Sequence, residues 1–240
     1  FLEKAQIPII KKKPKTFLGI AKQPHYENVI SNLYAFYFQV NEVHQLNDLF
    51  ISSLLELIKS SQTGNQVADL EEFSDFRCET EYTTEKGGRI DILLSNDEQG
   101  IIIENKVYHY LSNDLDDYWD SIELEAHQKV GIILSLTPVS DIKHNGFINI
   151  THLDLLNKVM ENIGSYIMAA EDKYVVFLKD FYQNISNISK SYMEEKELKF
   201  YYDHQVRIKQ TLKFNKAVKD HIINEVEKAG QDLEGLEMVS

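Results

Sequence analysis

The chain has 240 residues, of which 43% are hydrophobic, which predicts one globular domain with a helical appendage. Its 25 Lys and Arg against 38 Asp and Glu give a formal net charge of −13, which argues against tight, unassisted binding to long duplex DNA. The single cysteine, Cys78, excludes a disulfide within the chain and favours a cytoplasmic setting, and no apolar run is long enough to span a bilayer.

Residues 1–25 are predicted to form a basic, extended segment. Its lysines include the run KKKPK at 11–15, which could contact phosphates or act as an address signal. Short lysine runs are common by chance, so a solvated tail is favoured over both. The charges of this segment do not precede an apolar core, so no secretory signal is expected.

The next 140 residues alternate between helical and strand-like patterns. Apolar residues at helical spacing predict helices at 26–37 and 46–58, joined by the loop QVNEVHQ. Strands are expected at 77–82, 89–94, 101–108, 131–136 and 147–150, with a helix at 112–126 and another from Thr151 to about Asn162.

This order predicts the α/β fold class, with a mixed central β-sheet flanked by helices over residues 26–165. From 171 to 240 only helices are expected, at 173–188 and 193–229, so this part is predicted to be a helical C-terminal extension.

The strands at 89–94 and 101–108 form a predicted hairpin that carries charged residues. Alternation places Asp91 on one face of the first strand, and Glu104 and Lys106 together on one face of the second. The turn is centred midway between Asp91 and Glu104, so a regular hairpin sets their Cβ atoms about 5 Å apart. Two negative charges at that distance repel unless a cation lies between them, which predicts a divalent metal site.

The same hairpin also fits ordinary surface ion pairs, Asp91 with Lys106 and Arg89 with Glu104, on a solvated sheet face. Against this, the apolar runs beside these residues are typical of strands covered on both faces, where charges are costly. The spacing alone leaves both interpretations open.

The order Asp91, Glu104, Asn105, Lys106 resembles the active-site motif of the PD-(D/E)XK nuclease superfamily. The resemblance implies a restriction-endonuclease-like fold in which Asp91 and Glu104 hold Mg²⁺ or Mn²⁺. It adds the backbone carbonyl of Asn105 as a further ligand and gives Lys106 the role of orienting water or stabilising the transition state.

Two further stretches extend the resemblance to about residues 17–150. The first helix resembles the opening of one bacterial branch, where a helical Glu, here Glu27, belongs to the active site and a His, here His44, follows in the next loop. The sequence from Asp114 to Tyr118 resembles the Gln-Leu-x-x-Tyr helix motif of the superfamily, with Asp in place of Gln.

Each of these supporting residues also has an ordinary structural interpretation. Asp114 suits the positive end of a helix dipole, with Ser112 as the cap, and Tyr118 fits a buried helix face. Glu27 could be an exposed first-turn acid, and His44 a hydrogen-bonding loop residue.

The resemblance implies a metal-dependent nuclease, with DNA as the expected substrate, in bacterial restriction, anti-phage defence or repair. The acidity fits an enzyme that receives its substrate through a partner protein or another domain, and duplex cleavage favours a homodimer. Two alternatives stay open: a nuclease-fold module without activity, and a protein-interaction module that works through its acidic surface and helical C-terminal part.

Overall fold

The structure is a computed structural model that describes residues 7–8, 12–61, 70, 73–107, 113–189 and 195–231. Its contacts divide the chain into two compact units, Lys13–Lys190 and a unit formed by Phe1–Lys12 with Ser191–Ser240. Each unit is described by itself.

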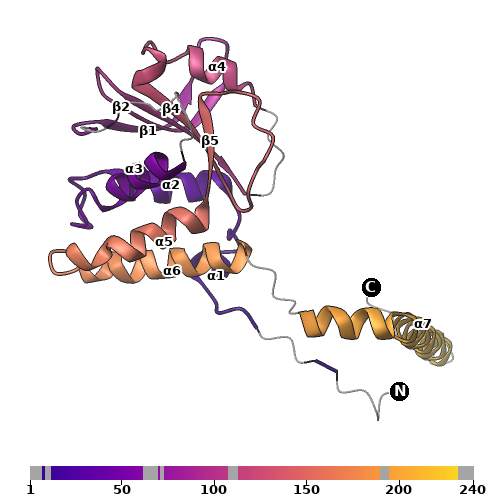
Figure 1. The fold of residues 1–240 in the computed structure, drawn as a ribbon. Coiled ribbons are helices and arrows are strands. Elements are labelled where there is room, and N and C mark those ends of the chain that lie inside the picture. The colour runs from indigo at the N-terminus through magenta and orange to yellow at the C-terminus, as the bar shows by residue number, and fades with distance from the viewer. Residues whose placement is uncertain are drawn as a thin grey trace. The chain divides into compact units, whose positions relative to one another are not determined.

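A five-stranded sheet lies at the centre of the larger unit, in the order β1-β2-β3-β4-β5 (Figure 1). The first three strands are antiparallel neighbours, whereas β3, β4 and β5 run parallel, so the sheet is mixed, as predicted. The strands are β1 (Arg77–Thr83), β2 (Arg89–Ser95), β3 (Gly100–Lys106), β4 (Lys129–Ser135) and β5 (Phe147–Thr151).

Helices cover both faces of the sheet, which confirms the predicted α/β class. Figure 1 shows α2, α3, α5 and α6 on one side and the short α4 on the other. The larger hydrophobic cluster lies on the first side and the smaller one beneath α4. The α-helices of this unit are α1 (Phe17–Ile20), α2 (Glu27–Phe38), α3 (Leu49–Ser61), α4 (Leu115–Asp120), α5 (His152–Asn162) and α6 (Asp172–Ser189), with 3-10 turns η1 (Ala126–Gln128) and η2 (Ile163–Ser165).

The predicted start of α5 is confirmed by its capping contacts. The Thr151 hydroxyl accepts a hydrogen bond from the Asp154 backbone N–H at 3.1 Å, and the Asp154 carboxylate accepts one from the Thr151 backbone N–H at 3.1 Å. This reciprocal pair satisfies two N–H groups that a helix end leaves unbonded.

The helix predicted at 112–126 is shorter in the structure. It consists of α4 followed by a turn and η1, and Asp114 caps it by accepting a hydrogen bond from the Asp117 N–H at 3.1 Å. The expected cap, Ser112, lies outside the described residues. The helix ends early because the buried Lys129 ammonium donates to two carbonyls near its end, at 2.7 Å each.

The compact units divide the chain differently from the predicted boundaries at 25 and 171. The expected extended segment contains α1, whose cap Thr16 donates a hydrogen bond to Asn184 on α6 at 3.0 Å. Helix α6, which was assigned to the extension, lies with the core because Leu178, Phe181 and Ile185 are buried in the larger cluster.

The smaller unit contains α7 (Glu195–Gln231), close to the predicted 193–229. Within the described residues, no helix combines the length and the apolar content that crossing a membrane requires.

Candidate active site

The pairing of β2 with β3 stops where the predicted site begins. The last paired residues are Ile92 and Ile103, and one further step of the same register puts Asp91 opposite Glu104, as the hairpin predicted. There, Oδ2 of Asp91 accepts a hydrogen bond from the backbone N–H of Asn105 at 2.8 Å. A side-chain carboxylate therefore takes the place of a strand partner at this point of the sheet.

Glu104 and Lys106 form a close pair at the end of β3. Nζ of Lys106 lies 2.6 Å from Oε1 of Glu104, whose side chain is only 1% exposed. The other oxygen, Oε2, is buried and has no hydrogen-bond partner. A buried, unsatisfied carboxylate oxygen costs free energy, so this atom is ready to accept a ligand.

Burial raises the pKa of both carboxyl groups. Burial, then repulsion from Asp91, raises the pKa of Glu104 to about 7, against the opposing effect of Lys106. Burial also raises the pKa of Asp91, although the Asn105 N–H and Lys106 counteract it. For Lys106, burial lowers the pKa, but its hydrogen bond to Glu104 and the surrounding carboxylates outweigh burial, so the pKa is raised overall and the ammonium keeps its charge.

The first turn of α2 is tied to the end of β3. Oε1 of Glu27 accepts a hydrogen bond from the Val107 N–H at 2.8 Å. In return, the Asn105 amide donates to the Glu27 carbonyl at 2.9 Å and to the Ser31 hydroxyl at 2.8 Å. These bonds hold Glu27 beside the two carboxylates, so it is not merely an exposed acid.

These side chains open into one cavity of about 380 Å³. It brings together six of the eight predicted site residues, and Asn105, between Glu104 and Lys106 in β3, does not line it. The lining consists of Glu27, Asn28, Gly88, Arg89, Asp91, Glu104, Lys106, Asn113, Asp114, Asp117 and Tyr118.

Comparison with protein families gives a match to a PD-(D/E)XK nuclease superfamily model over residues 16–199. The chain belongs to this superfamily. The matched region contains every residue of the cavity and ends within the first turns of α7. No curated protein and no solved structure matches the chain. Membership gives this PD-(D/E)XK protein a nuclease-type, hydrolytic function in general terms.

PD-(D/E)XK nucleases generally use divalent metals, and the cavity offers suitable donors. Asp91 and Glu104 present carboxylate oxygens, the ligands that Mg²⁺ and Mn²⁺ prefer, and Oε2 of Glu104 lacks a partner. Among the described residues, no three His, Cys, Asp or Glu side chains form a metal-binding group.

Asp114 and Tyr118 reach the cavity of this PD-(D/E)XK protein and also have structural contacts. Asp114 caps α4. The Tyr118 hydroxyl donates to the Arg89 carbonyl at 2.7 Å and accepts from the Asn113 amide at 2.8 Å, and its ring is buried in the smaller cluster. These bonds fix α4 against the start of β2, which carries Asp91.

His44 is not brought to the site. It lies in the loop after the far end of α2 and is fully buried. Its Nδ1 accepts a hydrogen bond from the Leu46 N–H at 2.9 Å, and its Nε2 lies 3.2 Å from the Phe36 carbonyl. Its contacts agree with the ordinary interpretation, a loop residue that holds the chain between α2 and α3.

The alternative of surface ion pairs is not what the structure shows. Nε of Arg89 pairs with Glu81 on β1 at 2.5 Å rather than with Glu104, and Lys106 pairs along its own strand. Glu81 has a positive φ of 58° and interrupts the β1–β2 pairing opposite Asp91. The register is the same on both sides of this break, so no residue is inserted in either strand.

Five cavity residues were not predicted as site residues: Asn28, Gly88, Arg89, Asn113 and Asp117. Asp117 is buried and accepts a hydrogen bond from the Thr84 hydroxyl at 2.6 Å, which ties α4 to the β1–β2 turn. Its place one residue before Tyr118 in the helix motif was the available signal. Arg89 was considered only as a surface ion-pair partner of Glu104, whereas its partner in the structure is Glu81.

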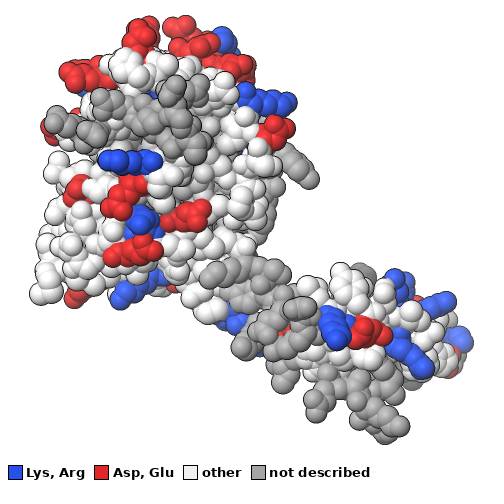
Figure 2. Space-filling view, viewed as in Figure 1, with Lys and Arg blue, Asp and Glu red and all other residues white. Residues whose placement is uncertain are grey.

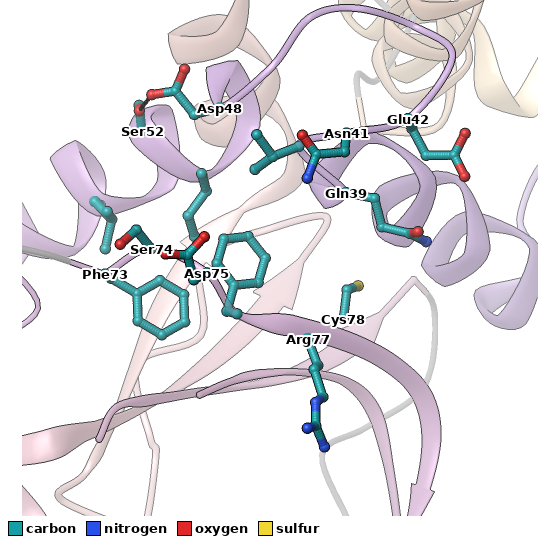
Figure 3. Close-up of a pocket in the computed structure, with 14 residues that line it drawn as sticks. Gln39, Asn41, Glu42, Asp48, Ser52, Phe73, Ser74, Asp75, Arg77 and Cys78 are labelled. Carbon is teal, nitrogen blue, oxygen red and sulfur yellow. Dashed lines mark hydrogen bonds between the residues drawn. The ribbon is translucent and has the colours of Figure 1, made fainter. Parts of the chain in front are cut away.

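A second cavity, of about 510 Å³, lies at the opposite end of α2 (Figure 3). It is lined by the loop after α2, by α3 and by the start of β1, where Figure 3 shows Arg77 and Cys78. Burial, then Glu79, raises the pKa of the Cys78 thiol to about 12, so it stays protonated. None of the predicted site residues lines this cavity.

Proposed function

We propose that the protein is a Mg²⁺- or Mn²⁺-dependent nuclease that hydrolyses phosphodiester bonds, with DNA as its substrate. The observation that carries the proposal is the pair of carboxylates, the half-buried Asp91 and the buried Glu104, beside the Lys106 ammonium in one open cavity. Buried like charges at the mouth of a cavity are expensive, and they are typical of sites that bind a cation or perform acid–base chemistry.

In this proposal Asp91 and Glu104 hold the metal, with the Asn105 carbonyl as a further ligand. A metal bound there would lower the pKa of water and neutralise phosphate oxygens. The ammonium of Lys106 keeps its proton and donates hydrogen bonds to the attacking water or to the negatively charged phosphate oxygens. Glu27 holds the end of β3 in place through the Val107 N–H.

The proposed biological setting is bacterial restriction, anti-phage defence or DNA repair. Because both strands of a duplex must be cut and each chain offers one such cavity in its described part, we include pairing of two chains in the proposal. Delivery of the substrate by a partner protein would offset the acidity of the chain.

A protein-interaction module is the second candidate, favoured by the charge of the core. Residues 13–190 contain 14 Lys and Arg and 27 Asp and Glu, so they carry the entire formal negative charge. Against an inactive module stands Glu104, since a buried and poorly satisfied carboxylate has no evident structural benefit.

The test is cleavage of supercoiled plasmid, single-stranded DNA and RNA with Mg²⁺, Mn²⁺ or EDTA. Wild type should cut DNA only with metal. Asp91→Asn, Glu104→Gln and Lys106→Ala should each reduce the rate by at least about a hundredfold, because each removes a charge from the reacting centre.

Two matched variants control for charge and folding. Asp75→Asn removes a carboxylate from the second cavity, at a positive φ of 49° that Asn tolerates, and Lys179→Ala removes an exposed lysine from α6. Both should cut like wild type. Cutting that survives in the site variants, or a folded wild type that cuts nothing, would contradict the proposal and favour the interaction module.

A further inference from the structure

The charge of the chain is unevenly distributed along its length. Helix α7 carries eight Lys and Arg against six Asp and Glu, in contrast to the strongly acidic core. Its central stretch, 207–219, holds five Lys and Arg and no acidic residue, whereas both flanking parts of the helix are rich in acids. Figure 2 shows Lys and Arg side chains along α7, and Asp and Glu side chains gathered at the α4 end of the core.

Three lysines of this stretch share one face of the helix. Lys209, Lys213 and Lys216 follow the spacing i, i+4, i+7, which aligns their side chains in a row about 10 Å long. All three are exposed. We name Lys209, Lys213 and Lys216 the lysine row.

The lysine row works against the stability of α7 unless an anion meets it. Like charges three and four residues apart destabilise a helix, whereas oppositely charged pairs stabilise it. The ion pair described within α7 joins Lys228 to Glu225 at 3.0 Å, outside this stretch. Within the described residues, none of the three lysines of the row forms an ion pair.

A polymer of regularly spaced negative charges is the partner whose chemistry fits this row. Nucleic acid places phosphates along its strands at distances that a row of lysines can follow, and neutralising them releases counterions. The net negative charge of the core opposes such an attraction. Helix α7 also exposes large apolar side chains, among them Leu212, Phe214 and Ile222, and a basic amphipathic helix is also typical of proteins that lie on membranes. Membership of a nuclease superfamily favours nucleic acid.

We propose that the lysine row of α7 is a nucleic-acid-binding surface that contacts the phosphate backbone without regard to sequence. The choice of nucleic acid as the partner rests on the proposed function. The surface lies beyond residue 199, where the superfamily match ends, so the match itself does not account for it. In this proposal it adds affinity for a substrate that the net charge of the core repels.

The test measures binding of the full chain to a fluorescent DNA duplex in EDTA, where metal-dependent cutting cannot occur, at salt concentrations between about 50 and 200 mM. The variant is the triple substitution Lys209→Ala, Lys213→Ala and Lys216→Ala, which keeps the helix because Ala is the best helix former. It should bind at least about tenfold more weakly. The slope of log affinity against log salt should fall by about 2 to 3.

The matched control is Lys196→Ala, Lys199→Ala and Lys228→Ala, which removes the same charge from the acidic ends of α7. It should bind like wild type. Equal losses in both variants, or undiminished binding in the lysine-row variant, would overturn the proposal. Binding to vesicles of anionic lipid that depends on the row, without binding to DNA, would also overturn it and assign the row to a membrane.

The outcome separates this inference from the proposed function. Row-dependent DNA binding by a chain that never cuts would support the lysine row and contradict the nuclease. Metal-dependent cutting of DNA, without binding that depends on the lysine row, would support the nuclease and contradict the role of the lysine row in binding DNA.

Discussion

Glu104 is a buried carboxyl group that gains little from the protein around it. One of its oxygens pairs with Lys106, and the other has no partner. Burial and the nearby Asp91 raise its pKa to about 7, so the folded chain resists its ionisation. A divalent cation at this position would reverse that effect by favouring the carboxylate form.

This raised pKa predicts how stability depends on pH in the metal-free protein. Below pH 4.5, the ordinary pKa of a Glu side chain, Glu104 is protonated in both the folded and the unfolded chain, so its shift does not lower stability. Between 4.5 and about 7, the unfolded chain releases a proton that the folded chain retains, so stability falls as pH rises and is constant above that range. Across this pH range, the free energy of unfolding of the wild type should fall by on the order of 3 kcal/mol relative to that of Glu104→Gln.

Urea denaturation in EDTA at pH about 5, 6 and 8 measures this difference. Glu98→Gln is the matched control, because Glu98 is an exposed acid in the turn of the same hairpin. It should show no such trend. A constant difference between wild type and Glu104→Gln at all three pH values would contradict the raised pKa.

Some residues of the site could be predicted from local sequence patterns, and others could not. Asp91 and Glu104 could be predicted because strand alternation and a centred turn fix which residues face each other. His44 could not be placed by the same means, because its position depends on the length of α2, which puts it at the far end of that helix. Arg89 pairs with Glu81 on β1, a residue whose positive φ no local pattern predicts.

At the scale of elements, the β1–β2 turn is held against α4 by a short network. The Thr84 hydroxyl accepts a hydrogen bond from the Gly88 N–H at 2.8 Å and donates one to Asp117 at 2.6 Å. A Cβ on Gly88 would stand 2.4 Å from Oδ2 of Asp117 and 2.9 Å from the Thr84 hydroxyl oxygen. Close approach of the two elements therefore requires glycine at this position.

Gly88→Ala should displace the turn from α4 and destabilise the protein by about 1 to 3 kcal/mol, the usual cost of overpacking. Cleavage should fall as well, since β2 begins at the next residue and carries Asp91. Urea denaturation and the plasmid assay measure the two effects. Gly164→Ala, where nothing lies within 4 Å of the added carbon, is the control and should stay within about 0.5 kcal/mol of wild type. Equal stability of the two variants would show that the contact is dispensable.

The elements differ in how far their own sequence determines them. The five strands and α5 lie close to the predicted ranges because alternation and a capping box are local signals. Helix α4 was predicted too long because its end depends on Lys129, which approaches from the sheet. In a regular strand Ile90 and Ile92 share a face, yet Ile90 packs in the smaller cluster and Ile92 in the larger one; this change falls where Glu81 interrupts the β1–β2 pairing.

At the scale of the whole molecule, the contacts divide the chain into two compact units. Both hydrophobic clusters lie within Lys13–Lys190. The predicted boundary at 171 differs from this division because a helix pattern does not reveal whether the helix packs on a core: α6 has buried apolar residues, whereas those of α7 are largely exposed.

A chain that ends at Lys190 should keep the stability of the core. Because Trp119 in α4 is the single tryptophan of the sequence, its fluorescence reports the unfolding of the core alone. The free energy of unfolding in urea should change by no more than about 0.5 kcal/mol. A lower midpoint or insolubility of the shortened chain would show that α7 supports the core.

The hydrogen bond between Asp91 and the Asn105 N–H affects which site residue would change first in a lineage that loses the activity. Glu104 burdens the fold, whereas Asp91 replaces a missing strand partner. In a lineage where cleavage is no longer selected, Glu104 would be replaced early, because its buried carboxylate destabilises the fold. Position 91 would retain Asp, or change to Asn, long afterwards, because either side chain can accept that bond. An acid at position 91 therefore indicates only that the fold is kept, whereas an acid at position 104 indicates that the activity is kept.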